Sequence, residues 1–136
     1  LSIRRQRQMC IRDSTAIENV QMPLQYSDTL DKKERNKKAL ECLEMVDLSN
    51  RAKHHPNELS GGQQQRVAIA RSLINNPDII LADEPTGNLD SKTSADIINL
   101  LKKLHQSGKT IIIITHDESI AREAMDTIRI KDGRII

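Results

Sequence analysis

Aromatic residues are almost missing from this sequence: Tyr26 is the only one in 136 residues, and neither tryptophan nor phenylalanine occurs. The chain therefore lacks the aromatic platforms on which single-stranded nucleic acids stack, and we expect no nucleic-acid partner. A core must be built from isoleucine, leucine, valine and alanine. The apolar share of 37% and the charged share of 29% are typical of a globular domain, and the length allows one core.

Cysteines and long apolar runs are also scarce. Cys10 and Cys42 form neither a metal-binding spacing nor a disulfide framework, so they are interpreted as ordinary small apolar residues in a reducing compartment. The longest apolar runs, residues 111–114 among them, are far shorter than the roughly 18 residues of a membrane span. The basic start is not followed by the apolar segment of a secretory signal. A role at a membrane would therefore require a partner.

Positive charge is concentrated at the start of the chain. The net charge is +2, but four arginines and one aspartate give residues 1–14 a charge of +3, which leaves −1 for the rest. Without this segment no basic nucleic-acid surface remains. Residues 1–14 show no periodicity and begin with Leu1, so they are interpreted as a solvated basic stretch or as an artefact of cloning or assembly, with no assigned fold.

Helical spacing of apolar residues predicts two helices in the first half. One begins after Asp31, an N-cap candidate with Glu34 three residues later, and the other begins at Ser60 and ends before Pro77. Between them, residues 49–58 are predicted to form a loop. Pro23 is expected to break any helix within residues 15–30.

The second half alternates strands and helices. Residues 79–82 and 111–114 are unbroken apolar runs, which predict strands buried on both faces of a parallel sheet. A helix capped by Gly108 lies between them, and a short helix over residues 118–125 and a hairpin over residues 127–136 follow. This order predicts an α/β fold with its ligand site beyond the carboxyl ends of the strands.

Residues 60–63 combine a capping box with two glycines. Ser60 and Gln63 have the spacing of N-cap and N3, and Gly61 and Gly62 lie between them. Glycines at the first turn let an anion approach the unpaired N–H groups of the helix start, where the helix dipole attracts it. A simple loop-to-helix start is the alternative.

Carboxylates and a histidine follow the two predicted strands. Asp83 and Glu84 end the first strand, where neighbouring side chains point in different directions and can hold Mg²⁺ and orient a water molecule separately. His116 ends the second strand on the same rim, within reach of a phosphate or of the carboxylate. Solvated surface side chains are the alternative for all three, and His54, His55 and His105 are interpreted as surface residues.

Three segments together resemble the ABC ATPase family. LSGGQQQRVAIARSL (residues 59–73) resembles the signature motif, IILADEPTGNLD (79–90) resembles Walker B with the D-loop, and IIIITHD (111–117) resembles the switch-histidine strand. Their order and separation also match, and the resemblance extends over residues 15–136. It implies the C-terminal part of an α/β P-loop cassette, with a helical signature subdomain over 15–76 and a core over 77–136.

The family also implies a role for each matching residue. ATP hydrolysis coupled to transport would use Glu84 to polarise water, Asp83 to position Mg²⁺ and His116 to sense the γ-phosphate. Asp90 would couple two sites across a dimer. The residues that would contact ATP held by the opposite subunit are Ser60, Gly61, Gly62 and Gln63.

The resemblance further implies partners and a location. Two cassettes would form a homodimer that powers export or release of a substrate through an integral-membrane permease, from the cytoplasmic face of the membrane. The residues Gly87–Asp90, with ENVQMPL at residues 18–24, resemble the bacterial macrolide-export and lipoprotein-release branch. The alternatives are a non-transport ABC ATPase and a non-catalytic interaction module derived from a cassette.

A phosphate-binding loop does not occur in the 136 residues. Residues 107–110 read Ser-Gly-Lys-Thr, but position 103 is lysine instead of glycine, and the turn leads from a helix into a strand, the reverse of the required order. Gln6 and Gln8 lie near the expected Q-loop position, but the residues around them do not fit, and neither is assigned that role.

We expect this chain alone to bind Mg-ATP weakly and to hydrolyse it negligibly. The backbone N–H groups and the lysine of a phosphate-binding loop supply most of the hold on the phosphates, and the motif is not in this sequence. Isothermal titration calorimetry of the 136-residue chain tests this, and micromolar affinity for Mg-ATP would contradict it.

Overall fold

A computed structural model describes residues 13–26 and 29–136 of the chain. The predictions for Gln6, Gln8 and Cys10, and most of the segment 1–14, lie outside these residues. The helices, 3-10 turns and strands are α2 (Ala16–Gln21), η1 (Met22–Leu24), α3 (Lys32–Met45), η2 (Ser49–Arg51), η3 (Pro56–Glu58), α4 (Gly61–Leu73), β1 (Ile79–Asp83), α5 (Ser91–Gln106), β2 (Thr110–Ile114), α6 (Glu118–Ala121), β3 (Ile130–Lys131) and β4 (Arg134–Ile135).

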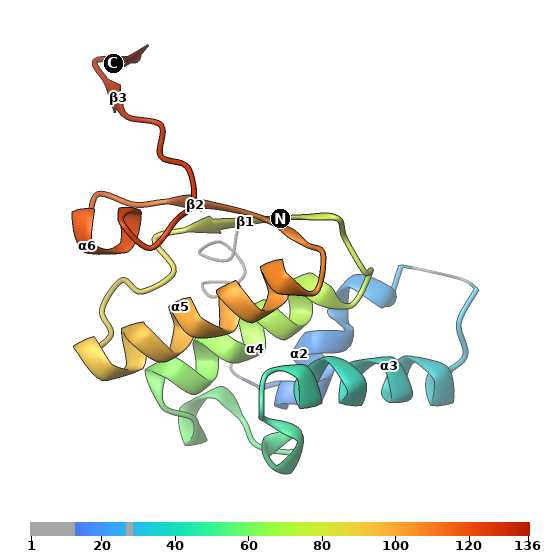
Figure 1. Cartoon of the computed structure of the whole chain (residues 1–136). Coiled ribbons are helices and arrows are strands. Elements are labelled where there is room, and N and C mark those ends of the chain that lie inside the picture. Colours follow the sequence, from blue (N-terminus) through green and yellow to red (C-terminus); the bar gives the residue numbers. More distant parts are fainter. Residues whose placement is uncertain (1–12, 27–28) are drawn as a thin grey trace.

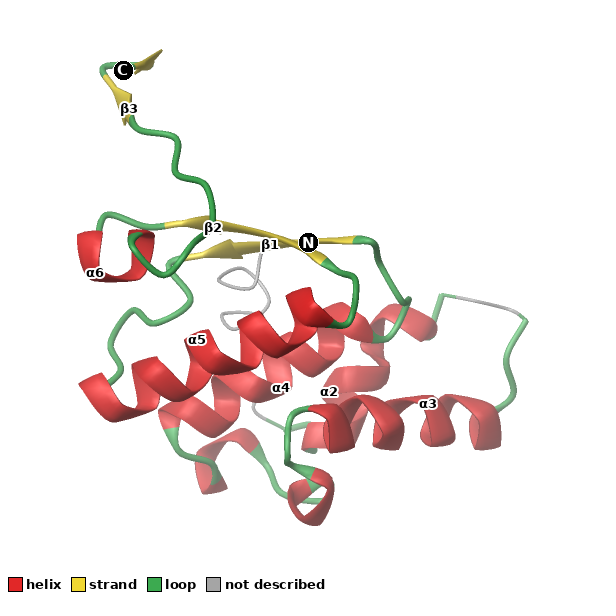
Figure 2. Cartoon of the chain, in the orientation of Figure 1, coloured by secondary structure: helices red, strands yellow, loops and turns green. Residues whose placement is uncertain are grey.

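Helices lie on one side of a small parallel sheet. Figure 1 shows α5 and α4 beneath β1 and β2, with α2 and α3 packed on the other side of α4. The same layering is visible by element type in Figure 2, where the hairpin β3–β4 projects away from the remaining elements. The chain is therefore layered as sheet, central helices and outer helices.

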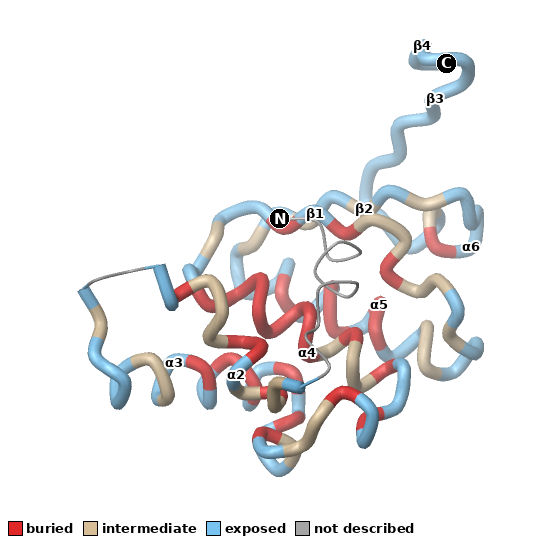
Figure 3. Tube along the Cα trace, turned by 180° about the vertical axis from the view of Figure 1, so that it is seen from behind, coloured by how far each residue is buried: buried red, intermediate tan, exposed pale blue. Residues whose placement is uncertain are grey.

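The core is centred on α4. Figure 3 shows buried segments concentrated in the helical layers. From Val67 to Leu73 every residue of α4 is buried, because α2, α3 and α5 all pack against this helix. One apolar cluster joins these helices to Ile80 and Ala82 of the sheet. It contains no aromatic side chain, in agreement with the composition.

Capping boxes begin three of the helices. Asp31 and Glu34 cap α3, and Ser60 and Gln63 cap α4, which confirms both predicted starts. The structure adds a third box, Thr15 with Glu18 at the start of α2, which the sequence analysis missed. Pro23 does not prevent this helix. It lies in the 3-10 turn after α2, where its missing N–H and fixed φ are tolerated.

The predicted parallel pairing of the two apolar runs is confirmed. Ile79 lies opposite Thr110 and Asp83 opposite Ile114, so both carboxyl ends reach the same edge. The prediction that both faces are buried is wrong. Helices cover the face of Ile80 and Ala82, whereas no element among the described residues covers the other face, and its apolar side chains are exposed: Ile79, Leu81, Ile112 and Ile114.

The smaller elements differ from the expectation mainly in length. The helix expected over 118–125 ends at Ala121, and the hairpin strands have only two residues each around Asp132 and Gly133. The loop predicted over 49–58 contains two 3-10 turns. Gly108 has a φ of 98° after α5, as expected for a left-handed helix end. None of the helices in the described ranges has the length and hydropathy needed to cross a membrane.

We predict that Leu43→Ala lowers the free energy of unfolding by about 2–5 kcal/mol, because its side chain is fully buried on α3, the helix that packs against α2 and α4. Leu40→Ala on the same helix is the matched control. Its side chain is 43% exposed, and we expect a loss of about 1 kcal/mol or less. Urea unfolding followed by circular dichroism measures both, and equal losses would show that α3 does not pack as described.

Candidate functional site

Glu84 departs from strand geometry directly after β1. Its φ of 47° is left-handed, an uncommon conformation for a residue with a side chain and one that costs about 1–3 kcal/mol. Two hydrogen bonds hold it there: the Glu84 N–H donates to the Ile114 carbonyl at 2.8 Å, and the Gly87 N–H donates to the Glu84 carbonyl at 3.1 Å. The carboxylate direction thus depends on this turn, and the strand alternation expected from the sequence does not apply to it.

The loop after β2 contacts both oxygens of the Glu84 carboxylate. His116 approaches Oε1 with Nδ1 at 2.6 Å and donates its backbone N–H to the same oxygen at 3.1 Å. The Thr115 hydroxyl donates to Oε2 at 3.4 Å. The structure therefore brings Glu84 and His116 together, and Thr115, which the sequence analysis did not single out, joins them.

These contacts shift the pKa values of both partners. Desolvation raises the pKa of Glu84, but hydrogen bonds and charge from His116, with the Thr115 hydroxyl, outweigh it and hold the pKa below its ordinary 4.5. The hydrogen bond and charge of Glu84 raise the pKa of His116 above its ordinary 6.5, and the charge of Asp117 adds to this. The His116 side chain is 91% exposed, so solvent screens this ion pair.

Asp83 ends β1 one residue earlier and is half-buried. Within the described part of the chain its carboxylate makes no hydrogen bond or ion pair, so its oxygens remain available. No group of three or more His, Cys, Asp or Glu side chains in that part could enclose a metal ion. Asp83 can therefore supply one ligand to a cation that takes its other ligands from phosphate and water.

The first turn of α4 keeps donors available. The Ser60 hydroxyl accepts from the Gln63 N–H at 3.2 Å, and the Gln63 side chain accepts from the Ser60 N–H at 3.0 Å. The N–H groups of Gly61 and Gly62 have no intrahelical acceptor at this end of a helix. Gly61 is exposed and Gly62 is buried, so the two glycines face different surroundings.

Asp90 is the N-cap of α5. Its side chain accepts a hydrogen bond from the Thr93 N–H at 3.4 Å, and hydrogen bonding by Thr93 lowers the pKa of the Asp90 carboxyl. This role could have been predicted, because an aspartate directly before an amphipathic helix is a frequent cap. Asp90 also lies beside α4, since Leu89 approaches Gly61 and Thr93 approaches Gly62.

The predicted residues thus form two groups. Glu84 and His116 meet at the carboxyl edge of the sheet, with Asp83 beside them in sequence. Residues 60–63 lie against residues 89–93, and Figure 1 shows the start of α4 well below the sheet. Leu89 and Thr93 carried no sequence signal, because their contacts join segments about thirty positions apart.

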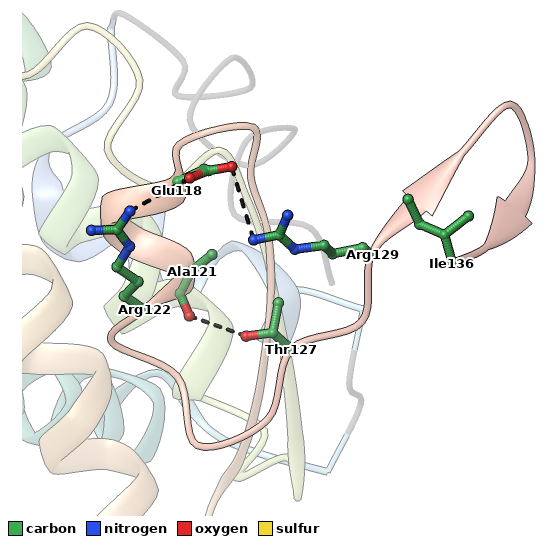
Figure 4. A pocket seen from close by; sticks show the side chains of 6 residues that line it. All are labelled: Glu118, Ala121, Arg122, Thr127, Arg129 and Ile136. Atoms are coloured by element: carbon green, nitrogen blue, oxygen red, sulfur yellow. Dashed lines mark hydrogen bonds and ion pairs between the residues drawn. The ribbon is translucent and has the colours of Figure 1, made fainter.

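A pocket of about 220 Å³ lies between α6 and the final strands. Figure 4 shows Glu118 between Arg122 and Arg129, whose guanidinium nitrogens are 3.6 and 3.9 Å from its carboxylate. Thr127 donates to the Ala121 carbonyl at 3.2 Å on the same side. The pocket contains none of the predicted site residues. Glu118 pairs with both guanidinium groups and offsets one of their two charges, and we assign the pocket no ligand.

A family model described as "ABC transporter" matches residues 1–87. The ABC transporter ATP-binding protein MJ0796 of Methanocaldococcus jannaschii is 58% identical over 125 residues, which cover 89% of this chain and 53% of that protein. The macrolide export ATP-binding/permease protein MacB 2 of Yersinia pestis is 50% identical over 131 residues, 96% of this chain and 19% of that protein.

A solved structure agrees with the sequence comparisons. The dimeric post-hydrolysis state of the ATP-binding cassette MJ0796, bound to ADP and Pi, has a TM-score of 0.80 and 51% identity. The match covers 98% of this chain and 59% of that one. The present chain spans about half the length of the ATP-binding proteins that it matches.

We predict that His116 titrates above 6.5 and that Glu84→Gln moves its midpoint down towards 6.5, because the neutral amide no longer favours the imidazolium. NMR of the imidazole signals across pH 5–9 measures this, with His116→Gln to assign the signal. The ion pair needs an ionised Glu84 and a protonated His116. It is therefore present from above the lowered pKa of Glu84 up to about 6.5, and it is lost as the pH rises through the raised pKa of His116.

Glu123→Gln is the matched control for this titration, since Glu123 pairs with Lys102 and does not contact His116. In the Glu123→Gln variant we expect the titration midpoint of His116 to equal its midpoint in the parent chain. A His116 midpoint that is the same with and without the Glu84 carboxylate would show that the two side chains do not meet in solution.

Proposed function

The chain belongs to the ABC transporter family, and we propose that it supplies the signature and hydrolytic parts of an ATPase that powers substrate export or release through a membrane permease. The contact between Glu84 and the 115–116 loop carries this proposal. The Glu84 carboxylate is ionised at neutral pH and can accept a hydrogen bond from water. Its lowered pKa makes it a weak base, so the contact supports a role in orienting and polarising water. Thr115 and His116 restrict its direction from two sides.

Two roles are open to His116 in such a site. It can hold the Glu84 carboxylate, as in the described contact, or turn its exposed ring towards a phosphate. Glu84 raises the pKa of His116 while the two side chains are in contact, and an anionic phosphate would favour the protonated ring for the same reason. We propose that His116 senses the terminal phosphate by exchanging one contact for the other.

The start of α4 is suited to bind the phosphate end of a nucleoside triphosphate. Ser60 and Gly61 are exposed, and the first-turn N–H groups with the positive end of the helix dipole favour an anion. We propose that Ser60, Gly61, Gly62 and Gln63 bind the phosphate of an ATP held mainly by a second cassette. The separation of this group from Glu84 supports contact in trans, since each site would combine different groups of two molecules.

Mg²⁺ fits the donor set at the end of β1. One carboxylate, Asp83, without a competing partner suits an ion that prefers one or two carboxylates and keeps phosphate and water ligands. Mg-ATP, when bound, supplies the transferable phosphoryl group and the cation that neutralises its charge. Asp83 would position the cation, and Glu84 would orient water beside it.

We further propose a homodimer of cassettes beside a permease at the cytoplasmic face of the membrane. The structure of the relative MJ0796 has been solved as a dimer, and the relative MacB is named an ATP-binding/permease protein. The subdomain division at residues 76 and 77 and the coupling role of Asp90 belong to the same proposal. The identity of about 50% to MacB macrolide-export proteins supports membership of the macrolide-export and lipoprotein-release branch.

We predict that Glu84→Gln, in a full-length protein that carries this segment, lowers kcat for ATP hydrolysis by at least about 100-fold and leaves ATP binding intact. The amide keeps the shape of the side chain but cannot polarise water. Phosphate release measures hydrolysis, and light scattering in saturating ATP should show an accumulated dimer.

Glu123→Gln controls for loss of an acidic side chain outside the site, and it should hydrolyse ATP like the parent protein. If Glu84→Gln turned over ATP at a rate close to that of the parent, Glu84 would not be the residue that activates water.

A further inference from the structure

Gly62 is enclosed by a side chain from another helix. A Cβ atom placed on Gly62 would lie 2.4 Å from Cγ2 of Thr93 and 3.8 Å from its Cβ. The first distance is far below van der Waals contact, so even an alanine requires movement. Thr93 is β-branched and helical, which limits the χ1 rotations that could relieve the overlap.

Gly61, one position earlier, meets a different environment. A Cβ there would approach only Cδ2 of Leu89, at 3.2 Å, which is the far end of a flexible side chain. Gly61 is exposed, whereas Gly62 is buried. The two adjacent glycines are therefore needed for different reasons: the first leaves its outer side open, and the second makes room for Thr93.

Thr93 is itself held at the start of α5. Its N–H is capped by Asp90, and the Ser94 N–H donates to the Asp90 carbonyl at 2.8 Å. Because Leu89 and Thr93 contact consecutive positions of α4, the starts of the two helices touch at two adjacent points. A shift of either start would break both contacts.

We propose that Thr93 is a positioning residue whose Cγ2 methyl, seated on Gly62, sets how the start of α4 lies against the start of α5. Residues 60–63 and residues 89–93 then move as one unit. One consequence rests on the proposed function: residues 60–63 and 89–93 together would form the surface that contacts a nucleotide held by a second cassette. The packing itself requires no ligand.

A double-mutant cycle on the 136-residue chain tests the packing. We expect Gly62→Ala to lower Tm by at least about 5 °C, Thr93→Ser to lower it by about 2 °C or less, and the double variant to recover more than half of the loss. Serine removes the obstructing methyl and keeps the backbone N–H that Asp90 caps. Should Gly62→Ala fail to fold, a regained cooperative transition in the double variant is the expected result.

Two further variants are matched controls. Gly61→Ala makes the same chemical change one residue away, and we expect its Tm to stay within about 2 °C of the parent or to rise, since alanine favours helix. Gly62→Ala with Thr93→Val keeps γ-methyl groups and should not recover. An unchanged Tm for Gly62→Ala, or the absence of recovery with Thr93→Ser, overturns the proposal.

The functional consequence is measured in full-length protein with the Glu84→Gln substitution, below the Tm of every variant. Gly62→Ala should raise the ATP concentration for half-maximal dimer formation by about tenfold, and Thr93→Ser should restore it. No recovery there, with recovery in the Tm cycle, overturns the consequence for ATP binding and leaves the packing contact in place. If the parent forms no ATP-dependent dimer while the Tm cycle shows recovery, the proposed function fails and the contact between Thr93 and Gly62 stands.

Discussion

Burial of α4 from Val67 to Leu73, with Ser60 and Gly61 exposed at its start, is the constraint on which the other elements depend. Helices α2, α3 and α5 pack around the segment from Val67 to Leu73, and α5 in turn supports the sheet. Small residues such as Ala68 and Ala70 allow this close packing. The same helix begins with exposed Ser60 and Gly61, so the element that stabilises the core also presents polar groups to solvent.

The carboxylate site depends on a second constraint, at the ends of the parallel strands. The register places Asp83 beside Ile114, so the residues that follow the two strands, Glu84 and Thr115, emerge together. The Ile114 carbonyl then accepts the Glu84 N–H and fixes the turn. Backbone pairing therefore determines the meeting of Glu84 and His116, and their side chains only complete it.

Local features could be predicted from the sequence, and contacts between distant segments could not. The boxes at Asp31 and Ser60 depend on residues three positions apart, and the two apolar runs indicated their strands directly. The box at Thr15 is equally local, but Pro23 argues against a helix in this segment when the sequence is read alone. The one-sided burial of the sheet and the contact between Thr93 and Gly62 depend on how separate elements pack together. A short window of sequence holds no information on that packing.

The left-handed backbone at Glu84 has an evolutionary consequence. At this position glycine would adopt the positive φ of the turn without steric cost, whereas the proposed chemistry requires a carboxylate. Selection for stability and selection for activity therefore favour different residues at the same place. Under the proposed function, a gene copy released from the need to hydrolyse ATP would relieve the strain of this turn by exchanging the glutamate for glycine.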